Sequence, residues 1–124
     1  MENVSFRFRR LERLKGKDAI QGVFARGRRV SCPGAKLFYV KNGLPHNRIA
    51  FTFARKYGNA VERNRSRRLS REVYRRLKSS LCMGYDLVLL VYPGLDTFQD
   101  RIRQLENLFS KAGLVTVTVE KWLG

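Results

Sequence analysis

The sequence predicts an α+β protein in which helices cover a small sheet mainly on one face. Residues 17–26, 59–79 and 97–112 carry apolar side chains at helical spacing, whereas residues 28–41, 48–55 and 85–92 have strand-like patterns. A turn divides the first strand-like segment in two, so the predicted order is αβββαβα. A length of 124 residues, 44% of them hydrophobic, suits one folded domain spanning residues 1–124.

The boundaries of the helices follow from capping residues. Asp18 stands in the first turn of the segment 17–26, where the helix dipole favours a carboxylate, and Gly27 is placed to end that helix. The helix 59–79 follows Tyr57-Gly58-Asn59, in which Asn59 can act as the cap. The last helix begins after Asp96 or Thr97, and its apolar stripe comprises Phe98, Ile102, Leu105, Leu108 and Phe109.

Turn residues separate the strands. Pro33-Gly34 divides residues 28–41, and Asn42-Gly43 ends this pair of strands. In residues 48–55, large apolar side chains alternate with small ones, which indicates a strand with two different faces. Residues 85–92 form the most apolar run and are predicted to be a buried central strand. If the strands on either side of the second helix are parallel, the general rule predicts a right-handed crossover between them.

The two ends of the chain have weaker patterns. Residues 1–16 are basic and aromatic, and we predict a partly extended tail, with a short helix at 8–14 as the alternative. Residues 113–124 form a C-terminal extension, in which the alternating VTVTV pattern at 115–119 predicts either a short strand or an extended tail.

Composition restricts the class of protein. The net charge is +16, from 26 Lys and Arg against 10 Asp and Glu, which indicates a nucleic acid or another anionic partner. No apolar run is long enough to span a membrane, and the N-terminal residues lack the apolar core of a secretory signal. Cys32 and Cys82 have neither disulfide-scaffold nor zinc-site spacing. We therefore expect a cytoplasmic protein with free thiols and no membrane partner.

The helix 59–79 lies within the most basic stretch of the chain. Residues 55–78 contain ten Lys or Arg against Glu62 and Glu72. Leu69, Val73 and Leu77 recur every four residues and predict the buried stripe. Four arginines recur at the same interval and are expected roughly opposite that stripe: Arg63, Arg67, Arg71 and Arg75.

A solvated basic helix is the simplest explanation of one charge run. Here, however, like charges four residues apart repel one another, and the helix has few acids to neutralise them. Most of the charges are arginines, whose planar forks suit bidentate phosphate contacts. A polyanion is the partner that would turn this repulsion into binding energy.

The stretch KYGNAVERNRSRRL at residues 56–69, with Arg71-Glu72 after it, resembles the signature of the protein subunit of bacterial ribonuclease P. The similarity covers about residues 10–112. It implies an αβββαβα two-layer sandwich with a left-handed βαβ crossover, like that of domain 2 of ribosomal protein S5. It also implies a monomeric subunit in a 1:1 complex with a catalytic RNA, whose bound Mg²⁺ supports removal of the 5′ leader from precursor tRNA.

The resemblance also implies roles for individual residues. An expected catalytic-RNA-binding set comprises Arg55, Lys56, Asn59, Arg63, Asn64, Arg65, Arg67, Arg68 and Arg71. An expected leader cleft between the first helix and the sheet comprises Ile20, Phe24, Phe38 and Tyr39. Phe38 and its neighbour Tyr39 are alternatives for one aromatic position, and core packing is the competing explanation for each of these aromatic residues.

No side chain in the sequence is assigned to catalysis or to metal binding. His46 is the only histidine and follows a proline in a predicted turn. Asp86, Asp96 and Asp100 do not have the pattern of a paired-carboxylate site. A structural RNA-binding protein of the ribosomal type is the main alternative, because it would share the charge and the arginine-rich helix.

Overall fold

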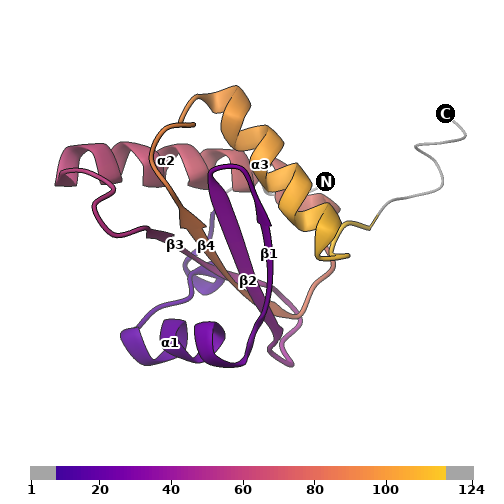
Figure 1. Ribbon diagram of the computed structural model, residues 1–124. Helices are drawn as coiled ribbons and strands as arrows, with labels where there is room; N and C mark the ends of the chain where they lie inside the picture. The colour runs from indigo at the N-terminus through magenta and orange to yellow at the C-terminus, as the bar shows by residue number, and fades with distance from the viewer. Residues whose placement is uncertain (1–7, 117–124) are drawn as a thin grey trace, which may run out of the picture.

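The computed structural model describes residues 8–116 of the protein (Figure 1). Its helices are α1 (Lys17–Arg26), α2 (Ala60–Leu77) and α3 (Phe98–Lys111), with short 3-10 turns at Arg10–Glu12 and Lys78–Ser80. Its strands are β1 (Arg28–Cys32), β2 (Ala35–Lys41), β3 (Arg48–Phe53) and β4 (Tyr85–Val91). The predicted order of helices and strands is confirmed, and most boundaries agree with the prediction to within two residues.

The four strands form one mixed sheet in the order β1-β2-β4-β3. β1 and β2 are an antiparallel hairpin, β2 pairs antiparallel with β4, and β4 pairs parallel with β3. The most apolar strand, β4, therefore has a hydrogen-bonded neighbour on each side, as predicted. Since β3 and β4 are parallel neighbours, the chain must return along the sheet between them, and α2 lies in this crossover.

The sheet separates α1 from α2 and α3 (Figure 1). On the side of α2 and α3, buried strand residues such as Leu37 and Leu89 pack with Tyr74 and Phe109. On the other side, Val23 of α1 packs with buried residues of β3 and β4. The larger core thus lies under two helices, and α1 covers part of the second face.

Residues 8–14 of the predicted N-terminal tail pack on the folded domain, with extended backbone at Arg9 and Arg13. Phe8 lies against Phe51 and Tyr74, with its ring centre 6.0 Å from each of theirs. Leu14 is buried, and its N–H donates to the carbonyl oxygen of Ile49 at 3.0 Å. The alternative, a helix at 8–14, is wrong, because the helical part is only the 3-10 turn at Arg10–Glu12.

Glu12 holds this segment to the end of α2. Its carboxylate accepts hydrogen bonds from Lys78 Nζ at 2.9 and 3.0 Å, and both side chains are largely buried. Such a pair joins residues 66 positions apart in the chain. Residues 8–14 can therefore pack in this way only after β3 and α2 have come together, because these elements and the turn after α2 supply the apolar surface and the ion partner of Glu12.

After α3 the chain turns back along Leu81. Val115 forms an isolated antiparallel bridge with Leu81, and the Thr116 N–H donates to Ser80 O at 2.7 Å. The described part of the C-terminal extension is therefore extended, with Leu114 buried. The remainder of the predicted VTVTV element lies outside the described residues. None of the helices within residues 8–116 combines the length and apolarity needed to cross a membrane.

Candidate nucleic-acid interface

A capping box fixes the start of α2. The Asn59 side chain accepts a hydrogen bond from the Glu62 N–H at 2.9 Å, and the Glu62 carboxylate accepts one from the Asn59 N–H at 3.0 Å. Asn59 was expected to contact RNA, and the structure gives it this local role. The cap places the arginines that begin at Arg63 in the first turns of a regular helix.

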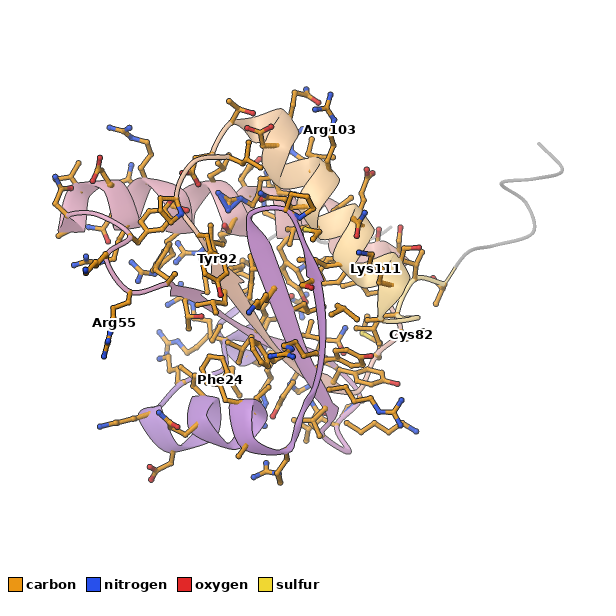
Figure 2. All side chains as sticks on the ribbon, viewed as in Figure 1. Phe24, Arg55, Cys82, Tyr92, Arg103 and Lys111 are labelled. Carbon is orange, nitrogen blue, oxygen red and sulfur yellow. The ribbon has the colours of Figure 1, made fainter. Side chains whose placement is uncertain are left out.

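The turn before α2 presents Arg55 and Lys56 to solvent. Lys56 adopts a left-handed backbone conformation with φ of 64°, which non-glycine residues rarely adopt. Tyr57 anchors the turn, because its ring is buried and its hydroxyl donates to Asp96 Oδ1 at 2.7 Å. Figure 2 shows Arg55 extending away from the body of the protein.

The buried face of α2 differs from the predicted stripe. The buried residues are Ser66, Ser70, Val73 and Tyr74, whereas Leu69 and Leu77 are only half-buried. The helix is rotated because Arg101 of α3 is fully buried, with nitrogens 3.5 and 3.4 Å from the hydroxyl oxygens of Ser66 and Ser70. Small polar residues therefore face the core, a pattern that apolar periodicity does not detect.

This rotation changes the position of the arginine ladder. Arg67 lies over the ring of Phe53 at 5.0 Å, and Arg71 lies over the ring of Phe8 at 5.7 Å. Both arginines are half-buried beside the core, so the prediction that the ladder lies opposite the buried face is wrong for them. A cation above an aromatic ring is stabilised by about 0.5–1 kcal/mol at exposed sites.

Other members of the expected RNA-binding set face solvent. Asn64, Arg65 and Arg68 are exposed, and Asn64 Oδ1 accepts a hydrogen bond from Arg67 at 2.9 Å. Arg63 is half-buried, and its guanidinium group donates to the carbonyl oxygen of Gly58. The first half of α2 therefore offers several guanidinium groups next to the exposed turn at 55–56, with Arg67 on the side of Phe53 and Arg65 on the side of Pro93 and Asp96.

The structure brings Ile20, Phe24 and Phe38 together between α1 and the sheet. The Phe24 and Phe38 rings meet nearly edge to face, with centres 4.7 Å apart, and both remain half-buried. Tyr39 is not part of this cluster. It lies on the opposite face of the sheet, where its ring centre is 6.4 Å from that of Tyr85.

The next row of the same sheet face contains residues that the sequence did not single out. Lys36 and Thr52 flank Leu90 across β2, β4 and β3, one rung beyond Phe38, and all three are half-buried. Lys36 also lies 5.6 Å from the centre of the Tyr92 ring. The strand register is needed to find this row, because its members come from three separate segments.

The acidic residues considered for catalysis have structural partners. Asp86 is paired with Arg48 at 2.8 Å, Asp96 accepts hydrogen bonds from Tyr57 and Arg101, and Asp100 caps α3 by accepting the Thr97 N–H. Burial raises the pKa of Asp86, but hydrogen bonds from Arg48 and Asn42 outweigh it, and the pKa lies below its ordinary value. Within residues 8–116, no group of three His, Cys, Asp or Glu residues could hold a metal ion.

These features define a class of protein: a small basic α+β domain with exposed guanidinium groups on one helix and half-exposed aromatic residues on the sheet. The family model for ribonuclease P matches residues 8–113. The ribonuclease P protein component of Symbiobacterium thermophilum is 39% identical over 107 residues, covering 83% of this chain and 92% of that protein. That of Petrotoga mobilis is 41% identical over 83 residues, covering 67% and 70%.

Solved structures agree with this similarity. The ribonuclease P protein of Thermotoga maritima superposes with a TM-score of 0.73 at 27% identity, covering 81% of this chain and 96% of that one. The Staphylococcus aureus protein superposes with a TM-score of 0.75 at 23% identity, covering 84% and 97%. The chain therefore belongs to the bacterial ribonuclease P protein family. It is a protein component of this tRNA-processing endoribonuclease, and its membership implies association with ribonuclease P RNA.

Proposed function

We propose that α2 and the turn before it bind the catalytic RNA of ribonuclease P. The proposed surface comprises the exposed or half-buried residues Arg55, Lys56, Arg63, Asn64, Arg65, Arg67, Arg68 and Arg71, with Asn59 fixing the start of the helix. Guanidinium forks can bind phosphates bidentately and stack on bases, which suits a folded RNA. In this role the protein assists cleavage and supplies no catalytic side chain.

The 5′ leader of precursor tRNA is proposed to lie on the sheet face beside α1. Ile20, Phe24 and Phe38 offer half-buried apolar and aromatic surface there, and Lys36 adds a nearby cation. Stacking of a single-stranded base on an aromatic ring contributes about 1–3 kcal/mol and tolerates different bases. Tyr39, on the other face, is left out of this site.

In the proposed complex, one copy of the protein joins one catalytic RNA in the cytoplasm, and the RNA holds most of the Mg²⁺ that supports hydrolysis. We also infer a single domain with a left-handed β3-α2-β4 crossover, as the family resemblance implies. The parallel pairing of β3 with β4 supports the presence of a crossover, and its hand is part of the proposal.

One observation carries the proposal: the basic face of α2 and the Phe24–Phe38 cluster lie on opposite sides of the sheet. A single small domain can therefore contact the catalytic RNA with one surface and a single strand with the other. A structural RNA-binding protein needs only the first surface.

The test is cleavage of a precursor tRNA at low Mg²⁺, with the catalytic RNA from the same organism, with and without the protein. We expect correct cleavage to require both components. Binding of the RNA without any stimulation of cleavage would favour the structural alternative, and cleavage by the protein alone would contradict an RNA-based reaction.

A matched pair of variants tests the leader site. Phe38→Leu should weaken binding of the holoenzyme to precursor tRNA by roughly fivefold or more, while binding of mature tRNA is unchanged, because a stacking surface is lost. Tyr39→Leu changes the adjacent aromatic residue on the opposite face and should not alter the difference between the two RNAs. Equal effects of both variants would contradict the placement of the leader beside α1.

A further inference from the structure

A groove lies where residues 8–13 cross the outer side of α2. It has a volume of about 780 Å³, and four of its lining residues are arginines: Arg13, Arg68, Arg71 and Arg75. Glu72 is the acid in this lining, and its carboxylate already accepts hydrogen bonds from Arg75 at 2.6 Å and Arg76 at 3.1 Å. The groove is therefore strongly positive.

Two of these arginines contact the ring of Phe8, which also lines the groove. The guanidinium carbons of Arg13 and Arg71 each lie 5.7 Å from the centre of this ring. Phe8 itself is fixed by its contacts with Phe51 and Tyr74 on the core. The folded N-terminal segment thus brings a cation from residue 13 to the basic face of α2, although the charges of Arg13 and Arg71 repel each other.

The surroundings of Arg71 show that the positive charges lining the groove act on one another. Its Nε is buried and has no hydrogen-bond partner within the described residues. Burial lowers the pKa of Arg71, and the neighbouring charges of Arg13, Arg67 and Arg68 lower it further. A buried donor without a partner normally costs free energy, so the contacts of Arg71 within the described residues leave part of its guanidinium group unsatisfied.

We propose that this groove binds backbone phosphate of the catalytic RNA, with Arg13 and Arg71 donating to the same phosphodiester. The inference rests on the proposed function and extends its RNA-binding surface from α2 to the N-terminal segment. RNA is favoured over an acidic peptide because Arg68 and Arg71 continue the surface that begins at Arg63. Arg63 and Arg71 are eight positions apart, which is only about 12 Å along α2, so one RNA can contact both parts of the surface.

The test uses the full-length protein and the catalytic RNA, with Arg13→Gln as the variant and Arg103→Gln as the control. Arg103 is exposed on α3 and does not line the groove. Arg103→Gln therefore removes the same charge at a site away from the groove. We expect Arg13→Gln to weaken binding about tenfold beyond the control. The slope of log affinity against log salt should fall by about 1, as for one lost phosphate contact. Thermal unfolding with sulfate checks that the exposed Arg13 is not needed for folding.

A double-mutant cycle with Arg71→Gln tests whether the two arginines share one phosphate. We expect the combined loss to be clearly smaller than the product of the two separate losses, since either variant already disrupts the shared contact. Independent losses would overturn the shared contact. Equal affinity and slope for Arg13→Gln and Arg103→Gln would overturn the site itself.

Two further outcomes separate this site from the rest of the proposal. If Arg13→Gln affects only the binding of precursor tRNA to the assembled holoenzyme, the phosphate belongs to the substrate and the assignment to the catalytic RNA is wrong. If the unaltered protein neither binds the catalytic RNA nor stimulates cleavage, the proposed function fails, whatever the variants do.

Discussion

Arg101 shows how one residue can set the position of a functional helix. Its side chain is completely buried, and its guanidinium group contacts Asp96 as well as the hydroxyls of Ser66 and Ser70. Nε has no hydrogen-bond partner within residues 8–116. The group therefore joins α3 to α2, although its charge has been removed from water at a cost.

Replacement of Arg101 separates the effect of its volume from that of its charge. Arg101→Ala should lower the free energy of unfolding by about 2–4 kcal/mol, because it leaves a cavity and removes a hydrogen-bond partner of two buried hydroxyls. Arg101→Met should lower it less, since methionine fills much of the space and removes the desolvated charge. Urea unfolding at constant sulfate would measure both, and a larger loss for methionine would contradict this explanation.

Asp86 predicts a dependence of stability on pH. Its pKa in the folded protein lies below the ordinary value of about 3.9. Its stabilising contribution is therefore present above pH 3.9 and is lost as the pH falls through the folded pKa. We expect the free energy of unfolding to decrease from about pH 5 towards pH 3, and Asp86→Asn to reduce this decrease.

The control for this experiment is Asp18→Asn, which changes an exposed carboxylate on α1. It should retain most of the acid dependence of the unmodified protein. If Asp86→Asn and Asp18→Asn have the same pH profile, the pair between Asp86 and Arg48 is not the source of the acid sensitivity.

At the scale of elements, the capping box makes the start of α2 independent of the rest of the fold. The Asn59 and Glu62 side chains satisfy N–H groups that would otherwise lack partners at the helix end. The cap could be predicted from the sequence because all its atoms come from four consecutive residues. The rotation of the same helix could not, because it depends on Arg101.

Substitution of Asn59 tests the cap. Asn59→Ala should lower the free energy of unfolding by about 1 kcal/mol, whereas Asn59→Ser should retain most of the stability because serine also accepts the N–H hydrogen bond. Thermal unfolding of the three proteins would show this order. Equal destabilisation by alanine and serine would mean that the side-chain hydrogen bond does not stabilise the helix.

At the scale of the whole molecule, the net charge of +16 opposes compaction. The larger core and the α1 cluster supply apolar burial on both faces of the sheet, while the arginines repel one another on the surface. We therefore expect the free protein to be only marginally stable. Multivalent anions should stabilise it by binding the folded state in preference to the unfolded chain.

This expectation can be tested by thermal unfolding in sodium sulfate and in sodium chloride at equal ionic strength. The midpoint temperature should be higher in sulfate, and an anion at 100 times its dissociation constant would contribute about 2.7 kcal/mol. Identical midpoints would show that general screening of charge, and not anion binding, controls stability.

The sequence by itself determined which segments become helices and strands, and where α2 and β4 begin. These features depend on caps and periodicity within a few residues, as at Asn59 and Thr97. The net charge also indicated an anionic partner, because charge is additive along the chain. The family resemblance then assigned that partner, and the matches to known proteins confirmed the family.

The tertiary structure decided which side chains share a surface. It placed Phe38 with Phe24 and sent Tyr39 to the other face, it turned Ser66 and Ser70 inward, and it brought residues 8–13 to α2. Each outcome depends on partners far away in the sequence, such as Glu12 and Lys78, which are 66 residues apart. Local patterns contain no information about such partners, because the contacts exist only once the sheet and its helices are packed.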